Sequence, residues 1–342
     1  PMDVIDQYGA DTLRFFLTTN SAPGMDLRYI PEKLEASWNF INKIWNSARF
    51  VLMNIDEDLE YKDLKFDHLN LCDKWILNRL NNVIEEVDAN MDKFEFVNVG
   101  SELYKFIWDD FCSWYIELTK VHLNSDNEVE KQASAHTLVY VLNAIVRMLH
   151  PFMPFVTEEI YQAIPHLEES ICISKYPTVN PDFNDENINK QFTYLMDIVK
   201  GVREIRANYT IKNAIEVEYS IETKDENLQA LLDQCVPYLK KLCNATCVGY
   251  NQEASKDVAT AMIQGGNTLI VELGAYVDKE AEKQKLQAEL QKLEGEIKRC
   301  TNMLSNEKFV SKAPQAKVDS ERQKLEDYTS KYNAVKEKLA AM

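Results

Sequence analysis

The sequence predicts a mainly helical protein that consists of an antiparallel helical bundle, a small α+β domain and a C-terminal antiparallel coiled-coil hairpin. Only nine glycines and ten prolines occur in 342 residues, which leaves few turns and favours long helices over a many-stranded sandwich. Apolar residues recur at helical spacing over most of the chain. The last part of the chain carries two heptad patterns separated by one short break.

The composition fits a folded protein whose surface is not basic throughout. Hydrophobic residues make up 45% of the chain and charged residues 27%, which is enough apolar material for a sizeable core. The formal net charge of −17 argues against a surface that binds nucleic acid everywhere. It leaves room for a local basic or aromatic patch.

Targeting signals and cysteine usage indicate the cellular compartment. No apolar run reaches the roughly 20 residues needed to cross a bilayer, and the first residues do not resemble a signal peptide. The seven cysteines are odd in number and scattered, as expected of free thiols in a reducing compartment. We therefore expect a cytoplasmic protein that has no membrane partner. Because the chain starts at Pro1 rather than methionine, we also expect it to be a piece of a longer protein.

The first 30 residues form a segment of their own, with two short helices around Gly9 and a loop at 21–24. A long helix follows from Pro31, which suits a first helical position, to about Asn54. Apolar residues recur along it at spacings of three and four. We predict that the core-facing stripe of this helix is Leu34, Trp38, Ile41, Trp45, Ala48 and Leu52.

Three further helical patterns follow, at 75–87, 97–118 and 133–149. Pro151 and Pro154 interrupt the third pattern, and a shorter helix restarts at 155–164 because proline is tolerated near a helix start. Together these helices predict an antiparallel bundle over residues 31–174.

Residues 175–275 are predicted to hold a linker and a small α+β domain. Pro177 and Pro181 mark the linker, and a helix is expected at 188–207. Alternating apolar residues at 217–221 indicate a strand, whereas 228–242 reads as a helix. Two short apolar runs on either side of Gly265 and Gly266 indicate a strand, a turn and a strand.

Residues 276–342 are predicted to form a helical hairpin. This segment contains 14 Lys plus Arg and 12 Asp plus Glu, so it carries +2 while the rest of the chain carries −19. Heptad seams run over 286–304 and 325–342, and the break between them at 305–314 predicts the turn. Arms of about 28 residues would be roughly 40 Å long.

The sequence gives no sign of a catalytic centre. No glycine-rich phosphate-binding motif occurs, and the five histidines are dispersed. Cys243 and Cys247 are four residues apart, but no nearby pair completes a four-ligand set. We therefore expect neither a catalytic residue nor a metal site.

One face of the helix that starts at Pro31 has the character of a nucleic-acid-binding surface. Asn39, Lys43, Asn46 and Phe50 are spaced four, three and four apart, and Arg49 lies beside them. Unpaired bases stack on aromatic rings, amides reach base edges and cations meet phosphates. The alternative is that another helix of the bundle covers this stripe and buries Phe50.

Two basic stretches are weaker candidates for contact with a phosphate backbone. One is a helix end that carries Arg203, Arg206 and Lys212. The other consists of residues outside the seam of the predicted hairpin: Lys292, Lys298, Arg299, Lys308 and Lys312. Lysines outside the seam of a coiled coil more often serve solubility and pairing, which is the competing interpretation.

Several segments resemble the valyl-tRNA synthetases. The matching segments are GADTLRFFL at 9–17, NFINKIWNSARFVLMN at 39–54, DKWILNRL at 73–80, WYIE at 114–117, HPFMPFVTEEI at 150–160, VREIRA at 202–207 and LSNEKFVSKAP at 304–314. The HPFMP block is shared in similar form by the leucyl, isoleucyl and methionyl enzymes. The hairpin with its SNEKFVSKAP turn is particular to the valyl enzymes. Because the matching segments are distributed from the first helices to the hairpin, the resemblance covers the whole chain.

The resemblance implies a tRNA-binding portion of a ligase that uses ATP and Mg²⁺ to join valine to its tRNA. The family's HIGH and KMSKS elements and its editing domain are not found in this sequence, so no cofactor is expected here. Residues 1–30 would contact the tRNA stem, 31–174 the anticodon loop and 276–342 the outer corner of the tRNA. Phe50 would stack on a base, Asn39 and Asn46 would read base edges, and Lys43 and Arg49 would hold phosphates.

A second hypothesis comes from another class of protein. The hairpin could act as a scaffold that binds a protein partner through its seam or tip, without RNA contact. Salt separates the two hypotheses, because phosphate binding weakens steeply with salt whereas an apolar contact barely responds. Under the first hypothesis we expect a monomer whose partner is valine tRNA and not DNA.

Overall fold

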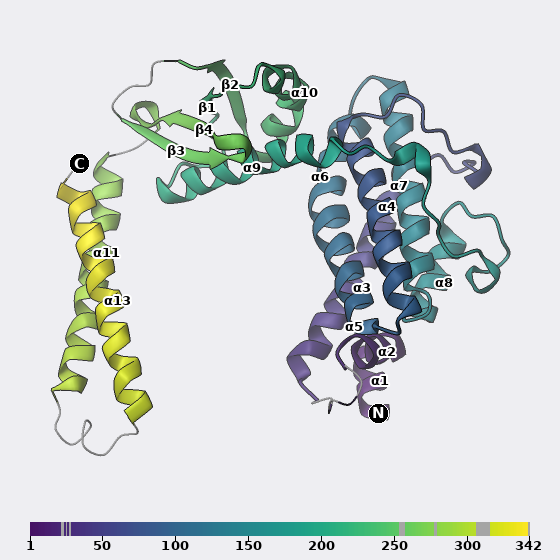
Figure 1. The fold of residues 1–342 in the computed structure, drawn as a ribbon, viewed down its shortest axis with the longest axis horizontal. Helices are drawn as coiled ribbons and strands as arrows, with labels where there is room; N and C mark the ends of the chain where they lie inside the picture. Colours follow the sequence, from purple (N-terminus) through teal and green to yellow (C-terminus); the bar gives the residue numbers. More distant parts are fainter. Residues whose placement is uncertain are drawn as a thin grey trace.

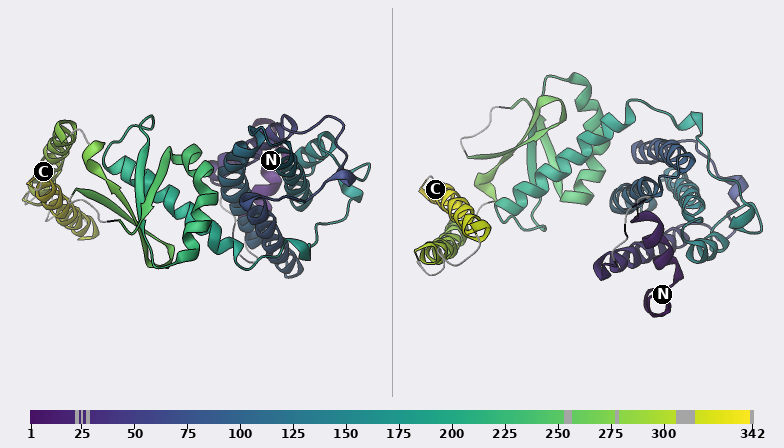
Figure 2. Two further views of the ribbon diagram at one scale, coloured as in Figure 1. Left: turned by 90° about the horizontal axis from the view of Figure 1, so that it is seen from above. Right: turned by 60° about the horizontal axis from the view of Figure 1, so that its bottom comes forward.

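The computed structural model describes residues 1–342 except 22, 23, 25, 27, 28, 253–256, 277, 278, 306–314, 341 and 342. A helical bundle, a small α/β domain and a helical hairpin follow one another along the chain (Figure 1). Figure 2 shows from two further directions that the α/β domain lies between the other two bodies. The predicted fold class is confirmed.

The bundle is built from consecutive helices that pack side by side. Their bounds are α1 Met2–Tyr8, α2 Ala10–Thr19, α3 Pro31–Leu52, α4 Leu71–Asp92, α5 Phe96–Lys105, π-helical η2 Phe106–Tyr115, α6 Ile116–Leu123, α7 Glu128–Leu149 and α8 Pro154–Ala163. Short 3₁₀ turns lie outside these helices, at η1 Tyr61–Asp63, η3 Ile171–Ile173 and η4 Pro181–Phe183. Because α5, η2 and α6 are contiguous, they form one rod that packs against α3, α4 and α7.

Local sequence signals set where these helices begin. Pro31 and Pro154 occupy the first positions of α3 and α8, where no N–H is needed. Asn70 caps α4 by accepting from the N–H groups of Cys72 and Asp73 at 2.9 and 3.0 Å. The Asp73 carboxylate accepts in return from the Asn70 N–H, which completes a capping box.

The N-terminal helices are tied to the bundle through α8. The Asp11 carboxylate of α2 accepts hydrogen bonds from the backbone N–H groups of Phe155 and Val156, at 3.3 and 2.7 Å. An acidic group at a helix N-terminus satisfies free N–H donors and also favours the helix dipole. The Arg14 guanidinium donates to the Pro151 carbonyl at 3.0 Å, so α2 holds both sides of the α7–α8 turn.

The core-facing side of α3 differs from the predicted stripe. Its buried residues are Leu34, Ser37, Phe40, Ile44, Ser47, Ala48 and Val51. The prediction was wrong for Trp38, Trp45 and Leu52, which are 42%, 41% and 36% exposed. Ser37 and Ser47 can be buried because their hydroxyls donate to the carbonyls of Lys33 and Lys43, four residues back. The core-facing side of α3 therefore combines apolar residues with two serines, and two large aromatic side chains face outward.

The α/β domain has a four-stranded sheet with two helices. Its elements are α9 Ile188–Asn208, β1 Val217–Glu222, α10 Glu226–Cys243, β2 Ala245–Tyr250, β3 Val258–Ile263, η5 Gln264–Gly266, β4 Asn267–Glu272 and η6 Leu273–Ala275. The strand order is β2-β1-β4-β3, with β1 and β2 parallel and the other pairs antiparallel. Gly265 and Gly266 have φ of 78° and 73° and form the turn between β3 and β4, as predicted.

The C-terminal hairpin consists of α11 Lys279–Leu304 and α13 Gln315–Ala340, which pack along each other (Figure 1). Leu286, Leu293, Cys300 and Val318 are buried in the seam, so the predicted hairpin is confirmed. The predicted turn falls mainly on residues 306–314, outside the described residues. Among the residues that the structure describes, no helix is long and apolar enough to cross a membrane.

Candidate nucleic-acid interface

The outward face of α3 presents amides and cations together. Asn39, Asn46 and Arg49 are exposed, and Lys43 and Phe50 lie half-buried at one edge of this face. The structure therefore places all five predicted anticodon-site residues on one continuous side of a single helix. We call this side, from Trp38 to Leu52, the α3 face.

Rings and cations alternate where the α3 face meets η2 and α6. The Lys43 ammonium lies 5.2 Å from the centre of the Trp108 ring, and the Lys120 ammonium lies 5.5 Å from the centre of the Phe50 ring. These distances suit cation–π attraction. Tyr104 stacks on Trp108 with ring centres 5.5 Å apart, so a third aromatic ring lies next to Trp108 along this edge of the α3 face.

The position of Phe50 fits neither full exposure for base stacking nor full burial under another helix, the two alternatives that the sequence leaves open. Its side chain packs partly against the hydrophobic core, and Lys120 lies over its ring. It is nonetheless only half-buried. A base that stacks on Phe50 would have to share the ring with, or displace, the Lys120 ammonium.

Sequence reasoning missed the two tryptophans of the α3 face. Trp38 and Trp45 are two helical turns apart, or about 10 Å along the axis, and both are more than two-fifths exposed. Their heptad-like spacing made them look like core residues. The signal that could have identified them is the pair of serines, because Ser37 and Ser47 lie on the buried side of α3.

The basic stretch at the end of α9 divides into surface and interior residues. Arg203 and Lys212 are exposed, and the Arg203 guanidinium donates to the Leu242 carbonyl at 3.0 Å. Arg206 is only 5% exposed, and its guanidinium donates to four backbone carbonyls in two segments of the chain. The acceptors are Cys243 at 3.1 Å, Lys212 at 2.9 Å, Ile215 at 2.7 Å and Asn244 at 2.8 Å. The interpretation of Arg206 as a phosphate contact is corrected, because this side chain holds the α/β domain together.

The predicted phosphate-contact residues of the hairpin differ in exposure and in ion pairing. Lys292 and Lys298 are exposed on α11. The Arg299 guanidinium is paired with Glu296 at 2.9 Å and with Glu321 at 3.5 Å. Lys308 and Lys312 lie outside the described residues, so the structure does not place them.

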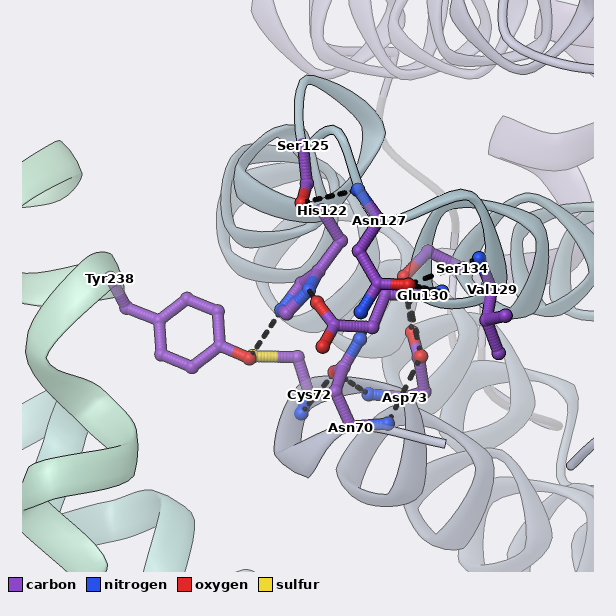
Figure 3. Close-up of polar contacts among 10 residues, drawn as sticks. All are labelled: Asn70, Cys72, Asp73, His122, Ser125, Asn127, Val129, Glu130, Ser134 and Tyr238. Atoms are coloured by element: carbon purple, nitrogen blue, oxygen red, sulfur yellow. Dashed lines mark hydrogen bonds and ion pairs between the residues drawn. The ribbon is translucent and has the colours of Figure 1, made fainter. Parts of the chain in front are cut away.

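A polar joint fixes the α/β domain against the bundle (Figure 3). The Tyr238 hydroxyl of α10 lies 2.6 Å from His122 Nε2 of α6, and His122 Nδ1 lies 2.9 Å from the Glu130 carboxylate of α7. Because the carboxylate accepts from Nδ1–H, Nε2 accepts from the tyrosine hydroxyl. The Trp75 ring of α4 and the Phe192 ring of α9 also stack between the bundle and the α/β domain, with centres 3.8 Å apart. The joint therefore sets the position of the α/β domain relative to the α3 face.

Asp73 is the buried acid of this region. Its carboxylate accepts from the Tyr115 hydroxyl at 2.7 Å and from the Ser134 hydroxyl at 3.3 Å. Burial raises the pKa of Asp73 from 3.8 to about 6, against the opposing effect of these hydrogen bonds. Folding therefore favours the protonated form, and the stability that Asp73 contributes below about pH 4 is lost as the pH rises through 6.

We expect Asp73→Asn to remove this pH dependence, because an amide cannot ionise. Between pH 4 and pH 7, the unfolding free energy of the original chain should fall by about 3 kcal/mol relative to the variant. Urea unfolding of both proteins at four pH values across this range measures the difference. Stability curves that run parallel would contradict the buried, raised-pKa assignment.

Two family models match this chain. The model described as the anticodon-binding domain of tRNA ligase matches residues 73–221, and the model described as the valyl tRNA synthetase tRNA binding arm matches residues 278–342. The valine–tRNA ligase of Enterococcus faecalis is 44% identical over 100% of this chain and 39% of the relative. Those of Bacillus cereus and Staphylococcus aureus are each 45% identical over 99% of this chain and 39% of the relative.

The helical bundle and the projecting hairpin, with these matches, define the class as the tRNA-binding domains of aminoacyl-tRNA synthetases. Within this class, the chain belongs to the valyl-tRNA synthetase family. It spans about 39% of the length of the relatives it matches.

Proposed function

We propose that this chain supplies the tRNA-binding surfaces of a valine–tRNA ligase. The α3 face would hold the anticodon loop, and the hairpin of α11 and α13 would contact the outer corner of the tRNA. The observation that carries this proposal is the α3 face itself, where exposed tryptophans, amides and cations share one helix side. Single-stranded RNA is bound by this combination of stacking, base-edge hydrogen bonds and phosphate contacts.

Each group on the α3 face has a distinct role in this proposal. Trp45 and the half-buried Phe50 offer rings for unstacked bases, and Asn39 and Asn46 offer amides that both donate and accept. Arg49 lies one helical turn after Trp45, so its guanidinium can meet a phosphate next to a base stacked on that ring.

The activity of the whole protein follows from the family. We infer that the complete protein attaches valine to its tRNA in the cytoplasm, using ATP and Mg²⁺, with both groups bound by residues outside this chain. The residues of this chain would bind and orient the tRNA, and none is assigned a step in the chemistry. A monomer with no DNA partner remains our prediction.

The hairpin suits recognition by charge and shape. The segment 276–342 carries +2 on a body of −19, so an RNA that approaches the arm meets less repulsion than elsewhere on the chain. Lys292 and Lys298 are exposed on α11 and available to phosphates. Such contacts position an RNA without reading its sequence.

We expect the double substitution Lys292→Ala and Lys298→Ala to weaken tRNA binding at low salt. The slope of the logarithm of affinity against the logarithm of salt should fall by about 1 to 2, since each lost phosphate contact removes roughly 0.7 to 0.9 from it. Fluorescence titration with valine tRNA at four salt concentrations measures this slope. The control is the double substitution Lys93→Ala and Lys175→Ala, which removes two exposed lysines of the bundle. If both double variants keep the original slope, the scaffold interpretation of the hairpin gains support.

A further inference from the structure

Three metal-ligating side chains meet at the end of the bundle where α7 turns into α8. They are His150 at the end of α7, Glu158 on α8 and Cys172 in the 3₁₀ turn η3. One nitrogen of His150, one carboxylate oxygen of Glu158 and the sulfur of Cys172 all lie within 4.8 Å of one another. His150 and Glu158 are half-buried, and Cys172 is exposed.

A hydrogen bond holds the His150 ring in the tautomer that can bind a metal. The Thr157 hydroxyl donates to the Met153 carbonyl at 2.7 Å, so it accepts from His150 Nδ1–H at 2.8 Å. The lone pair of Nε2 then points toward the Cys172 sulfur, 3.3 Å away. Metal-ligating histidines commonly have their second nitrogen fixed in this way.

The Glu158 carboxylate is oriented by two donors. The Gln162 amide donates to one carboxylate oxygen at 2.7 Å, and the Ser170 hydroxyl donates to the other at 2.9 Å. Each oxygen keeps a free lone pair.

We propose that His150, Glu158 and Cys172 bind a divalent metal ion, and that zinc is the ion that fits best. Imidazole nitrogen, thiolate sulfur and carboxylate oxygen are the three ligand types that zinc accepts. Bonds of about 2.0 to 2.3 Å at tetrahedral angles separate ligand atoms by roughly 3.3 to 3.8 Å. The separation of His150 Nε2 and Cys172 Sγ already meets this requirement. The exposed Cys172 and the half-buried Glu158 carboxylate need to approach by about 1 Å at most.

Binding at this site exchanges a proton for the metal. The Cys172 thiol hydrogen now lies against His150 Nε2. Zinc would take the Nε2 lone pair and the thiolate, the thiol proton would leave to solvent, and water would complete four-fold coordination. Because its ligands come from three separate elements, the ion would cross-link the turn after α7, helix α8 and the segment that follows α8.

The spacing of the three ligands explains why no metal site is recognisable from the sequence alone. Zinc motifs are recognised by pairs of ligands two to five residues apart, whereas His150, Glu158 and Cys172 are separated by eight and fourteen residues. Only the fold of the α7–α8 turn and of the segment after α8 brings them together.

Zinc and cobalt titration of the chelator-stripped chain tests the proposal. We expect the original chain, which contains Cys172, to bind one equivalent of zinc. Because zinc would bind only the folded state, it should also raise the melting temperature. Cobalt should give a sulfur-to-metal charge-transfer band and the intense visible bands of four-fold coordination. Cys172→Ser should remove the charge-transfer band and weaken zinc binding by more than roughly tenfold.

Two further variants separate this site from other thiols and from general effects on folding. Cys247→Ser removes a half-buried cysteine of β2 and should change neither the band nor the zinc affinity. Thr157→Val keeps all three ligands but removes the bond to His150 Nδ1, and should weaken zinc binding by about 10-fold. The proposal is overturned if the original chain binds no stoichiometric zinc, or if Cys172→Ser binds it as tightly.

Discussion

Replacement of Arg206 by alanine is expected to unfold the α/β domain at temperatures where the original chain is folded. The Arg206 guanidinium is 5% exposed and donates to four backbone carbonyls, at 2.7 to 3.1 Å. These carbonyls belong to the loop before β1 and to the segment that joins α10 to β2. Without the guanidinium, the Cys243 and Ile215 carbonyls lose this donor, whereas the Lys212 and Asn244 carbonyls keep the backbone N–H groups of Ile215 and Val217. We expect the loss to cost about 2 to 5 kcal/mol of unfolding free energy.

Arg203→Ala is the matched control, because it removes an arginine one turn away on α9. Arg203 is exposed and donates a hydrogen bond to the Leu242 carbonyl, so its loss should change stability by less than about 1 kcal/mol. Thermal and urea unfolding followed by circular dichroism compare the two variants. If Arg206→Ala unfolds no more easily than Arg203→Ala, then Arg206 is not a structural residue, and its interpretation as an RNA contact returns.

The second large effect concerns RNA rather than stability. We expect Trp45→Ala to weaken binding of valine tRNA by roughly tenfold, since a stacked base contributes about 1 to 3 kcal/mol. The Trp45 side chain is 41% exposed and lies outside the buried side of α3. Its loss should therefore leave the melting temperature within a few degrees of the original value.

Phe94→Ala provides the comparison for Trp45→Ala. Phe94 is 72% exposed on the turn between α4 and α5, so this variant removes an even more exposed aromatic ring outside the α3 face. Binding of valine tRNA should be unchanged. Equal losses of affinity in the two variants would mean that exposed rings contribute nonspecifically and that the α3 face is not the site.

Much of the fold can be predicted from the sequence, because periodicity and turn residues act locally. The glycine pair at 265 and 266 marks the β3–β4 turn. The heptad spacing marks the seam of the hairpin, where Leu286, Leu293 and Cys300 are buried. These features depend only on residues close together in the chain.

The candidate site was only partly predictable, because exposure depends on what packs against a helix. The stripe of Asn39, Lys43, Asn46 and Phe50 was placed on one helix side, but Trp38 and Trp45 were assigned to the core. Hydrophobicity favours burial of tryptophan over serine. At Ser47 the serine is buried instead, because η2 packs closely there and the Ser47 hydroxyl lies 3.0 Å from the Cys112 sulfur. Partners distant in sequence decided the outcome.

The same limit applies to Arg206. Its position beside other basic and polar residues at a helix end gives no indication of burial, because two of its acceptors, at Cys243 and Asn244, lie more than 35 residues away. The metal-ligand cluster at His150 was missed for a similar reason, since Cys172 follows a separate helix.

The most direct test of the central claim is a titration of this chain with valine tRNA and with a copy in which only the anticodon is changed. The measurement is made at low and at moderate salt, for the original chain and for Trp45→Ala. If the α3 face holds the anticodon loop, the changed anticodon weakens binding to the original chain, and Trp45→Ala reduces this difference. Salt weakens both RNAs alike. Equal affinity of the original chain for the two RNAs would contradict anticodon recognition by the α3 face.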